Sequence, residues 1–208
     1  MATEDGESAG RLIPSRRGVQ ALREAAAGCR ACPLWRRGTQ TVFGAGAARA
    51  PVMLIGEQPG DREDREGLPF VGPAGHLLDR ALAEAGIEPR RTYRTNVVKH
   101  FKWKPRGKRR IHQTPSKLEV DACRPWLDAE LERVRPSVVG ILGATAAKSL
   151  LGSGFRVTKQ RGELLSVDFA PAAVATLHPS AILRADDEER EQAFADLVAD
   201  LRVVSGAA

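Results

Sequence analysis

Short apolar runs alternate with longer amphipathic segments along this chain. The runs that predict strands are residues 51–56, 92–98, 136–143, 163–167 and 172–178. The segments with helical spacing are residues 18–27, 74–86, 115–134, 144–152 and 186–204. Strand–helix alternation favours an α/β fold in which helices cover both faces of a parallel sheet. We predict a single α/β domain with a central parallel sheet of about four strands.

Polar motifs stand at the carboxyl ends of three predicted strands. The stretch "GEQPG" (56–60) follows the first strand, Asn96 lies near the end of the second, and "HPS" (178–180) follows the last. In open α/β sheets this edge is where ligands bind. We therefore expect Glu57, Asn96 and His178 to meet in one site.

The composition fits one globular domain. Of the 208 residues, 42% are hydrophobic and 28% are charged, which is enough apolar material for a sizeable core. We expect residues 1–15 to be disordered and residues 16–208 to form the domain. No apolar run approaches the ~18 residues of a membrane helix, and "MATEDGESAG" lacks the apolar core of a signal peptide. We expect a cytoplasmic monomer without membrane contact.

The positive charge is concentrated in one block. Residues 89–118 contain eleven Lys or Arg and no Asp or Glu, whereas the rest of the chain has a net charge of −5. Such a block favours a surface that tracks a polyanion such as DNA. A solvated loop is the alternative. The block includes "KRRIH", in which Lys108, Arg109 and Arg110 lead to His112.

Three cysteines suggest a metal site with one ligand missing. Cys29 and Cys32 form a C-x-x-C pair, and Cys123 stands alone. An odd count argues against a disulfide framework. His100 is the candidate fourth ligand, because histidine replaces cysteine on the iron of some clusters. An iron–sulfur cluster, a zinc site and a redox-active C-x-x-C all remain open.

Six stretches in order resemble the uracil-DNA glycosylase superfamily, especially its iron–sulfur, family-4 branch. They are "CRACPLWRRGTQTVFGAG", "GEQPGDREDREGLPFVGPAGHLLDRAL", "YRTNVVK", "DACRPWLDAEL", "VVGILGATAAKSLLG" and "TLHPSAILR", and they span about residues 28–200. The resemblance implies a three-layer α/β/α fold and uracil-containing DNA as the partner, which would place the protein on the nucleoid when bound. It also implies a 4Fe–4S cluster on Cys29, Cys32, His100 and Cys123.

Two departures from the family-4 pattern indicate a subtype. Gln58 replaces the alanine of "GEAPG", and His100 replaces a cysteine. The interval before Cys123 is also longer and contains "KRRIH". These features resemble the UdgX type, which becomes covalently attached to uracil-containing DNA. That resemblance implies that His112 attacks the sugar.

The resemblance also implies roles in binding the base. Phe70 is expected to stack on the extruded uracil, and Asn96 to read its edge by accepting from N3–H and donating to O4. His178 would donate to O2 as the base departs. Gln58 is a further candidate for holding uracil. Asp61 is a weaker candidate, because "DREDRE" is also typical of a solvated acidic turn.

The remaining roles concern the sugar and the DNA backbone. Glu57 would stabilise the cationic sugar, orient water or fix the tautomer of His112. Lys108, Arg109 and Arg110 are expected to bind phosphate, and Arg110 to place His112. Arg184 would contact the backbone. Residues 181–183 resemble an apolar wedge that fills the vacated stack.

Three functions remain open from the sequence. The leading hypothesis is a single-turnover enzyme that excises uracil and stays joined through His112 to C1′ of the abasic site. The second is an ordinary multi-turnover family-4 uracil-DNA glycosylase, in which the long loop only binds DNA. The third is a cluster-containing nucleic-acid-binding module without chemistry.

Overall fold

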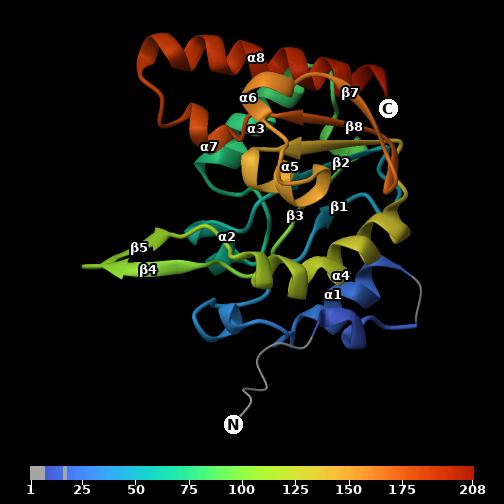
Figure 1. Cartoon of the computed structure of the whole chain (residues 1–208), viewed down its shortest axis with the longest axis vertical. Coiled ribbons are helices and arrows are strands. Elements are labelled where there is room, and N and C mark those ends of the chain that lie inside the picture. The colour runs from blue at the N-terminus through green and yellow to red at the C-terminus, as the bar shows by residue number, and fades with distance from the viewer. Residues whose placement is uncertain (1–7, 16–17) are drawn as a thin grey trace.

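A six-stranded sheet forms the centre of the computed structural model, which describes residues 8–15 and 18–208 (Figure 1). The strands lie in the order β1 (Ala45–Gly46), β3 (Thr92–Asn96), β2 (Val52–Gly56), β6 (Val138–Leu142), β8 (Ala170–Thr176) and β7 (Leu164–Val167). The four central strands are parallel, as predicted, and β1 and β7 pair antiparallel at the two edges. The two-residue β1 was not predicted, because it is too short to show an alternating pattern.

Helices pack on both faces of the sheet. The longer ones are α1 (Val19–Ala26), α3 (Pro73–Glu84), α4 (Lys117–Val134), α5 (Ala144–Leu151) and α8 (Asp187–Gly206). Short ones are α2 (Asp61–Glu66), α6 (Val157–Gln160) and α7 (Pro179–Ile182), with 3₁₀ turns η1 (Ala9–Leu12), η2 (Pro33–Arg36) and η3 (Pro89–Arg91). In Figure 1, α3 and α8 lie on one side of the sheet and α1 and α4 on the other.

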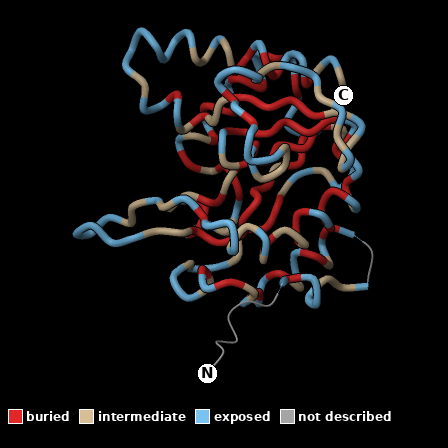
Figure 2. The backbone as a smooth tube through the Cα atoms, viewed as in Figure 1, coloured by how far each residue is buried: buried red, intermediate tan, exposed pale blue. Residues whose placement is uncertain are grey.

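Alternate residues of the central strands enter two separate cores. Met53 and Ile55 pack with residues of α1 and α4, including Leu22 and Trp126. Their neighbours Val52 and Leu54 face the opposite way and pack with residues of α3 and α8. β2 and β6 are buried on both faces, which is why each reads as a continuous apolar run in the sequence (Figure 2). The arrangement confirms the expected three layers.

Two local predictions were wrong. The segment considered as a solvated acidic turn is the helix α2, in which Asp64 is fully buried. Within the segment expected to be disordered, residues 9–12 form η1 and Ala9 is buried. The rest of that expectation, residues 1–7, lies outside the described residues.

The basic segment is a β-hairpin rather than the predicted loop. Strands β4 (Trp103–Arg106) and β5 (Arg109–His112) pair antiparallel, and the hairpin projects from the body of the protein (Figure 1). Gly107 has φ 58° at the first position of the two-residue turn, where a side chain would be strained. His112 pairs with Trp103, so it lies at the base of the hairpin and not at its tip.

In the part of the chain that the structure describes, no helix is long and apolar enough to cross a membrane.

Candidate active site

A cavity of about 550 Å³ lies at the carboxyl ends of the central strands. The predicted residues that line it are Glu57, Gln58, Phe70, Asn96, His112, His178 and Arg184. They lie just after β2, at the end of β3, in the loop before α3, in the hairpin and on either side of α7, so the parallel strands bring distant motifs to one edge of the sheet. Asp61 does not line the cavity.

Three of the side chains that line this cavity meet beside Gly56. A Cβ added at Gly56 would lie 2.5 Å from Asn96 Oδ1 and 2.9 Å from Phe70 Cζ. His178 Nε2 would be 3.6 Å from the same point. The three side chains therefore converge on one small volume, and only glycine leaves room for them there.

His178 presents a hydrogen-bond donor to this volume. It caps the N-terminus of α7, and its Nδ1 accepts from the backbone N–H of Ser180 at 3.1 Å. Because Nδ1 is an acceptor, the ring proton of the neutral imidazole lies on Nε2. Burial, together with the charges of Arg184 and His112, lowers the pKa of His178 to about 4. The ring is therefore neutral at pH 7, with its Nε2–H directed to the volume shared with Asn96 and Phe70.

Phe70 forms an aromatic wall on a tight loop. Its backbone has φ 58°, which is unusual for a residue other than glycine. A Cβ at Gly75 would lie 1.8 Å from the carbonyl oxygen of Phe70, so the loop can approach α3 only at a glycine. The ring is buried and stacks against His178, with 6.4 Å between centroids and 29° between planes. A flat base can stack on such a ring.

Glu57 and His112 face each other at the cavity mouth. Glu57 Oε1 lies 3.4 Å from His112 Nε2, yet this buried oxygen has no hydrogen-bond partner among the described residues. The His112 side chain is 49% exposed. Partial burial lowers the pKa of His112, Glu57 opposes this shift, and Arg184 adds to it. The mouth therefore holds a neutral imidazole beside a carboxylate oxygen that is available to a ligand.

Gln58 holds the hairpin. Its Nε2 donates to the carbonyls of Lys102 at 3.2 Å and Gln113 at 3.1 Å, and its Oε1 accepts from the Lys102 N–H at 3.0 Å. Lys102 and Gln113 flank the two strands of the hairpin, so one carboxamide joins both ends of it. Both Nε2 protons are used in this way, and the only group left to bind a substrate is a second lone pair on Oε1.

Arg110 and Asp61 are placed differently from the predictions. Arg110 donates to the carboxylates of Asp61 and Asp64, the latter at 2.6 Å, and its side chain is only 14% exposed. Its guanidinium also lies 5.4 Å from the ring centroids of both Phe101 and Trp103. In this structure these contacts engage Arg110 with carboxylates rather than leaving it free for phosphate, and they engage Asp61 with Arg110 outside the cavity. They do fix β5 two residues before His112.

The other residues predicted to contact DNA lie at the surface or at the cavity. Lys108 and Arg109 are exposed at the hairpin turn, and Arg184 lies at the cavity. The predicted wedge is shorter than expected, because Ile182 is buried in the core. Leu183 is 38% exposed.

Glu63, which was not predicted as a site residue, also lines the cavity. Its Oε1 accepts from the Gly72 N–H at 2.8 Å, which fixes the loop that follows Phe70. Thr114 and Ser180 also line the cavity. In the sequence, nothing distinguishes Glu63 from the other acidic residues of "DREDRE".

The three cysteines are free and buried. Burial raises the pKa of Cys32 to about 11 and that of Cys123 to about 12. Cys29 Sγ accepts from the indole N–H of Trp126, and Cys123 Sγ from the Lys99 N–H, each at 3.3 Å. Neighbouring cysteines contribute to both pKa shifts, so the three thiols share one region.

His100 is not grouped with these thiols as a metal site. Its Nε2 lies 3.1 Å from the Thr41 hydroxyl, and burial lowers its pKa to about 4. Within residues 8–15 and 18–208, no three or more His, Cys, Asp or Glu side chains are grouped so that they could hold a metal ion. The predicted four-ligand set is therefore not assembled in this structure.

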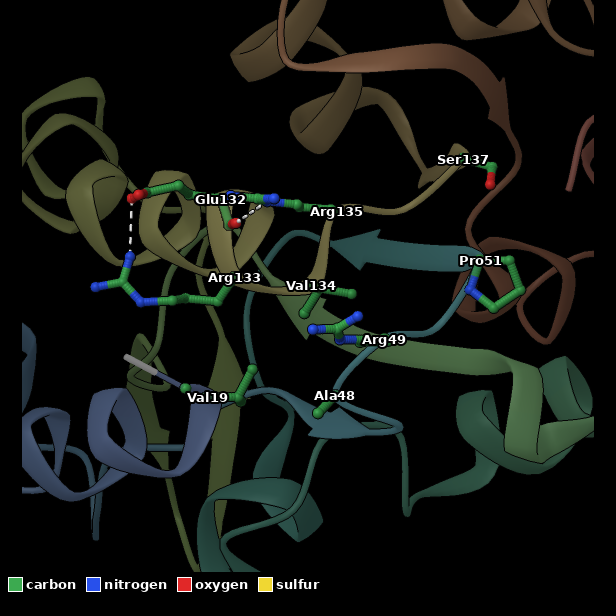
Figure 3. Close-up of a pocket in the computed structure, with 10 residues that line it drawn as sticks. Val19, Ala48, Arg49, Pro51, Glu132, Arg133, Val134, Arg135 and Ser137 are labelled. Atoms are coloured by element: carbon green, nitrogen blue, oxygen red, sulfur yellow. Dashed lines mark hydrogen bonds and ion pairs between the residues drawn. The ribbon is translucent and has the colours of Figure 1, made fainter. Parts of the chain in front are cut away.

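A larger cavity, of about 730 Å³, lies at the opposite edge of the sheet, next to Pro51 and Ser137 (Figure 3). Two of the arginines that line it contact Glu132 of the same cavity. Arg133 pairs with Glu132 at 2.8 Å, and Arg135 donates to the Glu132 carbonyl at 3.2 Å. None of the predicted site residues lines this cavity, so the smaller one is the candidate active site.

Several known proteins are similar to this chain. Residues 43–202 match the family model described as the uracil DNA glycosylase superfamily. The chain is 35% identical over 173 residues to a type-4 uracil-DNA glycosylase of Sulfurisphaera tokodaii, covering 79% of this chain and 76% of that protein. It is 39% identical over 157 residues to that of Thermotoga maritima, covering 75% and 78%.

A solved structure shares the fold. The crystal structure of SMUG2 from Pedobacter heparinus superposes with a TM-score of 0.54 and 14% identity, over 76% of this chain and 77% of that one. At this identity the similarity supports the α/β architecture alone.

Proposed function

Since this chain belongs to the uracil DNA glycosylase superfamily, we propose that it removes uracil from DNA in the manner of the type-4 enzymes it resembles. One observation carries the proposal most strongly. The half-buried, neutral His178 directs Nε2–H to the same point as the Asn96 carboxamide and the Phe70 ring. A donor, a carboxamide and an aromatic face are the groups that a flipped-out uracil requires.

Recognition begins when the base leaves the stack, because the enzyme cannot reach it inside a duplex. Phe70 stacks on the flipped base. The Asn96 carboxamide accepts from uracil N3–H and donates to O4. Cytosine presents an acceptor at N3 and a donor at C4, so the same carboxamide mismatches it at both positions.

The N1–C1′ bond breaks with its electron pair moving onto the base. The negative charge that develops on O2 is stabilised by a hydrogen bond from the Nε2–H of His178, which keeps its proton, and Glu57 stabilises the positive charge on the sugar. In ordinary hydrolysis, water then adds to C1′ and loses a proton. The products are uracil and an abasic site.

We propose as a second candidate that His112 replaces that water, because a neutral imidazole lies at the cavity mouth beside Glu57. With its proton on Nδ1, the Nε2 lone pair forms a bond to C1′, and the ring takes up the charge that the sugar loses. Loss of the Nδ1 proton to solvent leaves a neutral alkylated imidazole. This is a poor leaving group, so the adduct persists.

An assay on a single-stranded oligonucleotide with one uracil separates the three functions. Free uracil in excess over protein indicates ordinary turnover. A band that resists heat and denaturant, at one DNA per protein, indicates capture by His112. If neither product forms, the catalytic proposal is wrong and a non-catalytic binding module is favoured.

We propose that Cys29, Cys32 and Cys123 supply sulfur ligands to a 4Fe–4S cluster, with His100, which contacts the Thr41 hydroxyl and is not grouped with the thiols in this structure, as the fourth ligand. The three thiols are suitable ligands for such a cluster, because they are buried together and two of them accept N–H hydrogen bonds. Such bonds are typical around cluster sulfurs. The cluster would hold this region of the fold together, and no step of the reaction passes through it.

The metal content tests this ligand set. The purified protein is expected to contain iron and inorganic sulfide, both measured by colorimetric assay. Cys123→Ser should lose them, whereas His100→Cys should keep them because a thiolate replaces the imidazole. One zinc per chain without iron would contradict the proposal.

The hairpin turn is expected to bind DNA phosphates. Replacing Lys108 and Arg109 with alanine should flatten the plot of log affinity against log salt, since each lost phosphate contact changes the slope by roughly 0.7 on single strands. Fluorescence anisotropy from 50 to 300 mM salt measures this, with Arg202→Ala on the distant α8 as the control. A change in the preference for uracil would instead show that the turn reads bases.

A further inference from the structure

A lysine and a glutamate form a buried ion pair beneath the candidate pocket. Lys99 is 1% exposed and Glu130 is fully buried, and Lys99 Nζ lies 2.5 Å from Glu130 Oε2. The same ammonium donates to the Thr95 hydroxyl and to the main-chain carbonyl of Asn96, each at 2.7 Å. All three of its N–H donors are therefore used, and one of them holds the residue proposed to read uracil.

Glu130 is equally occupied. Its Oε1 accepts from the Tyr93 hydroxyl at 2.8 Å and from the Gly44 N–H at 3.1 Å, and both of its oxygens lie 3.0 Å from the Thr95 hydroxyl. Burial and the charge of Glu130 raise the pKa of Tyr93, so this hydroxyl stays protonated as a donor. One carboxylate thus connects α4 to both ends of β3.

The segment from Asn96 to Lys99 also fixes the backbone of Glu57. The Val97 N–H donates to the Gly56 carbonyl at 2.9 Å, and the Val98 N–H to the Glu57 carbonyl at 3.0 Å. A displacement of Lys99 would therefore be transmitted to both the carboxamide and the carboxylate of the site.

Stability alone does not require such a pair. Removing two charges from water is costly, and apolar side chains of similar volume are often as stable or more stable. What the pair does provide is fixed geometry, because each hydrogen bond holds one main-chain or hydroxyl group of β3 or of Gly44, and one of them holds Asn96.

We infer that Lys99 and Glu130 are positioning residues that hold Asn96 in register with the pocket and so set the discrimination of uracil from cytosine. This inference rests on the proposed function, since it assigns the pair to the same site. Neither side chain lines the cavity, so both act through Asn96 and Glu57.

The test removes both charges together. Lys99→Met alone would leave Glu130 buried without a partner, so the variant of choice is Lys99→Met with Glu130→Gln, in which the amide oxygen still accepts from Tyr93 and Gly44. We expect KM for uracil-containing DNA to rise at least fivefold and the uracil-to-cytosine ratio of kcat/KM to fall about tenfold. The melting temperature should change little.

A matched control is available on the far side of the sheet. Arg161 Nη1 pairs with the buried Asp200 at 2.7 Å, and Asp200 accepts from Thr176 at 2.6 Å. Arg161→Met with Asp200→Asn removes a comparable pair and should leave KM and base discrimination unchanged. If the Lys99–Glu130 double variant also kept its wild-type KM and discrimination, the pair would be structural only and the inference would be wrong.

A second variant and a spectroscopic readout cover the remaining outcomes. Thr95→Val removes the hydroxyl between the two charges without unpairing them, so it serves as the test if the double variant does not fold. It should raise KM and lower the uracil-to-cytosine ratio of kcat/KM by smaller factors. The side-chain amide NMR signals of Asn96, assigned from their absence in Asn96→Asp, should shift or broaden in both variants but not in the control. If the wild-type protein released no uracil, the proposed function would fail, while unchanged Asn96 signals in the variants would separately refute the positioning role.

Discussion

Replacing His178 with alanine is expected to slow the release of uracil by roughly 100- to 1000-fold, the usual effect of removing one donor that stabilises a developing anion. His178 Nδ1 is held by the Ser180 N–H, so Nε2–H is fixed before the reaction begins and need not reorganise. Because the pKa of His178 is about 4, the donor should remain neutral from pH 8 to about pH 5. Single-turnover rates, measured with excess protein on a uracil oligonucleotide, report this step.

Ser180→Ala is the matched control for this prediction. It removes the hydroxyl that lies 2.8 Å from His178 Nδ1 but keeps the backbone N–H that fixes the tautomer. Its loss should therefore be no more than about tenfold, which corresponds to one neutral hydrogen bond. If His178→Ala lost no more than Ser180→Ala, His178 would have a structural role only.

Replacing His112 with alanine or glycine is expected to abolish any denaturant-resistant adduct and to allow ordinary turnover. The substitution removes the proposed nucleophile and opens space for water, while Glu57 remains to orient it. In the wild-type protein, proximity can favour the tethered His112 over water by ~7–11 kcal/mol. Without this group, the product should change almost completely from the adduct to the abasic site. Denaturing gels detect the adduct, and alkali cleavage detects the abasic site.

Glu57→Gln separates chemistry from capture. It should slow both the adduct of the wild-type protein and the hydrolysis gained by His112→Ala, because both pass through the same cationic sugar. Mass spectrometry of a digested adduct should place the sugar on the peptide that contains His112. An adduct that persists in His112→Ala would overturn the assignment. If the wild-type protein forms free uracil without any adduct, His112 contributes only to DNA binding.

The order of the elements and the location of the site could be predicted from the sequence, since both depend on local patterns. β2 and β6 read as apolar runs because both of their faces are buried. The motif around Glu57 follows β2, Asn96 ends the more polar β3, and His178 follows β8. Parallel strands bring these carboxyl ends to one edge. The hydrophobic pattern that predicts the strands, together with their parallel direction, was therefore enough to place these three residues in one site.

The partners of the polar side chains were decided only by the tertiary structure. Arg110 lies within an acid-free block of the sequence and so predicted a phosphate contact, but the carboxylates of α2, nearly fifty residues away, bind it in the fold. The carboxamide of Gln58 finds main-chain groups of the hairpin, which look the same in any sequence. Lys99 reads as one more surface cation until Glu130 of α4 is packed against it. The sequence shows how many hydrogen bonds a charged or amide side chain can make. Its partners depend on which distant groups the packed core brings within about 3 Å of it.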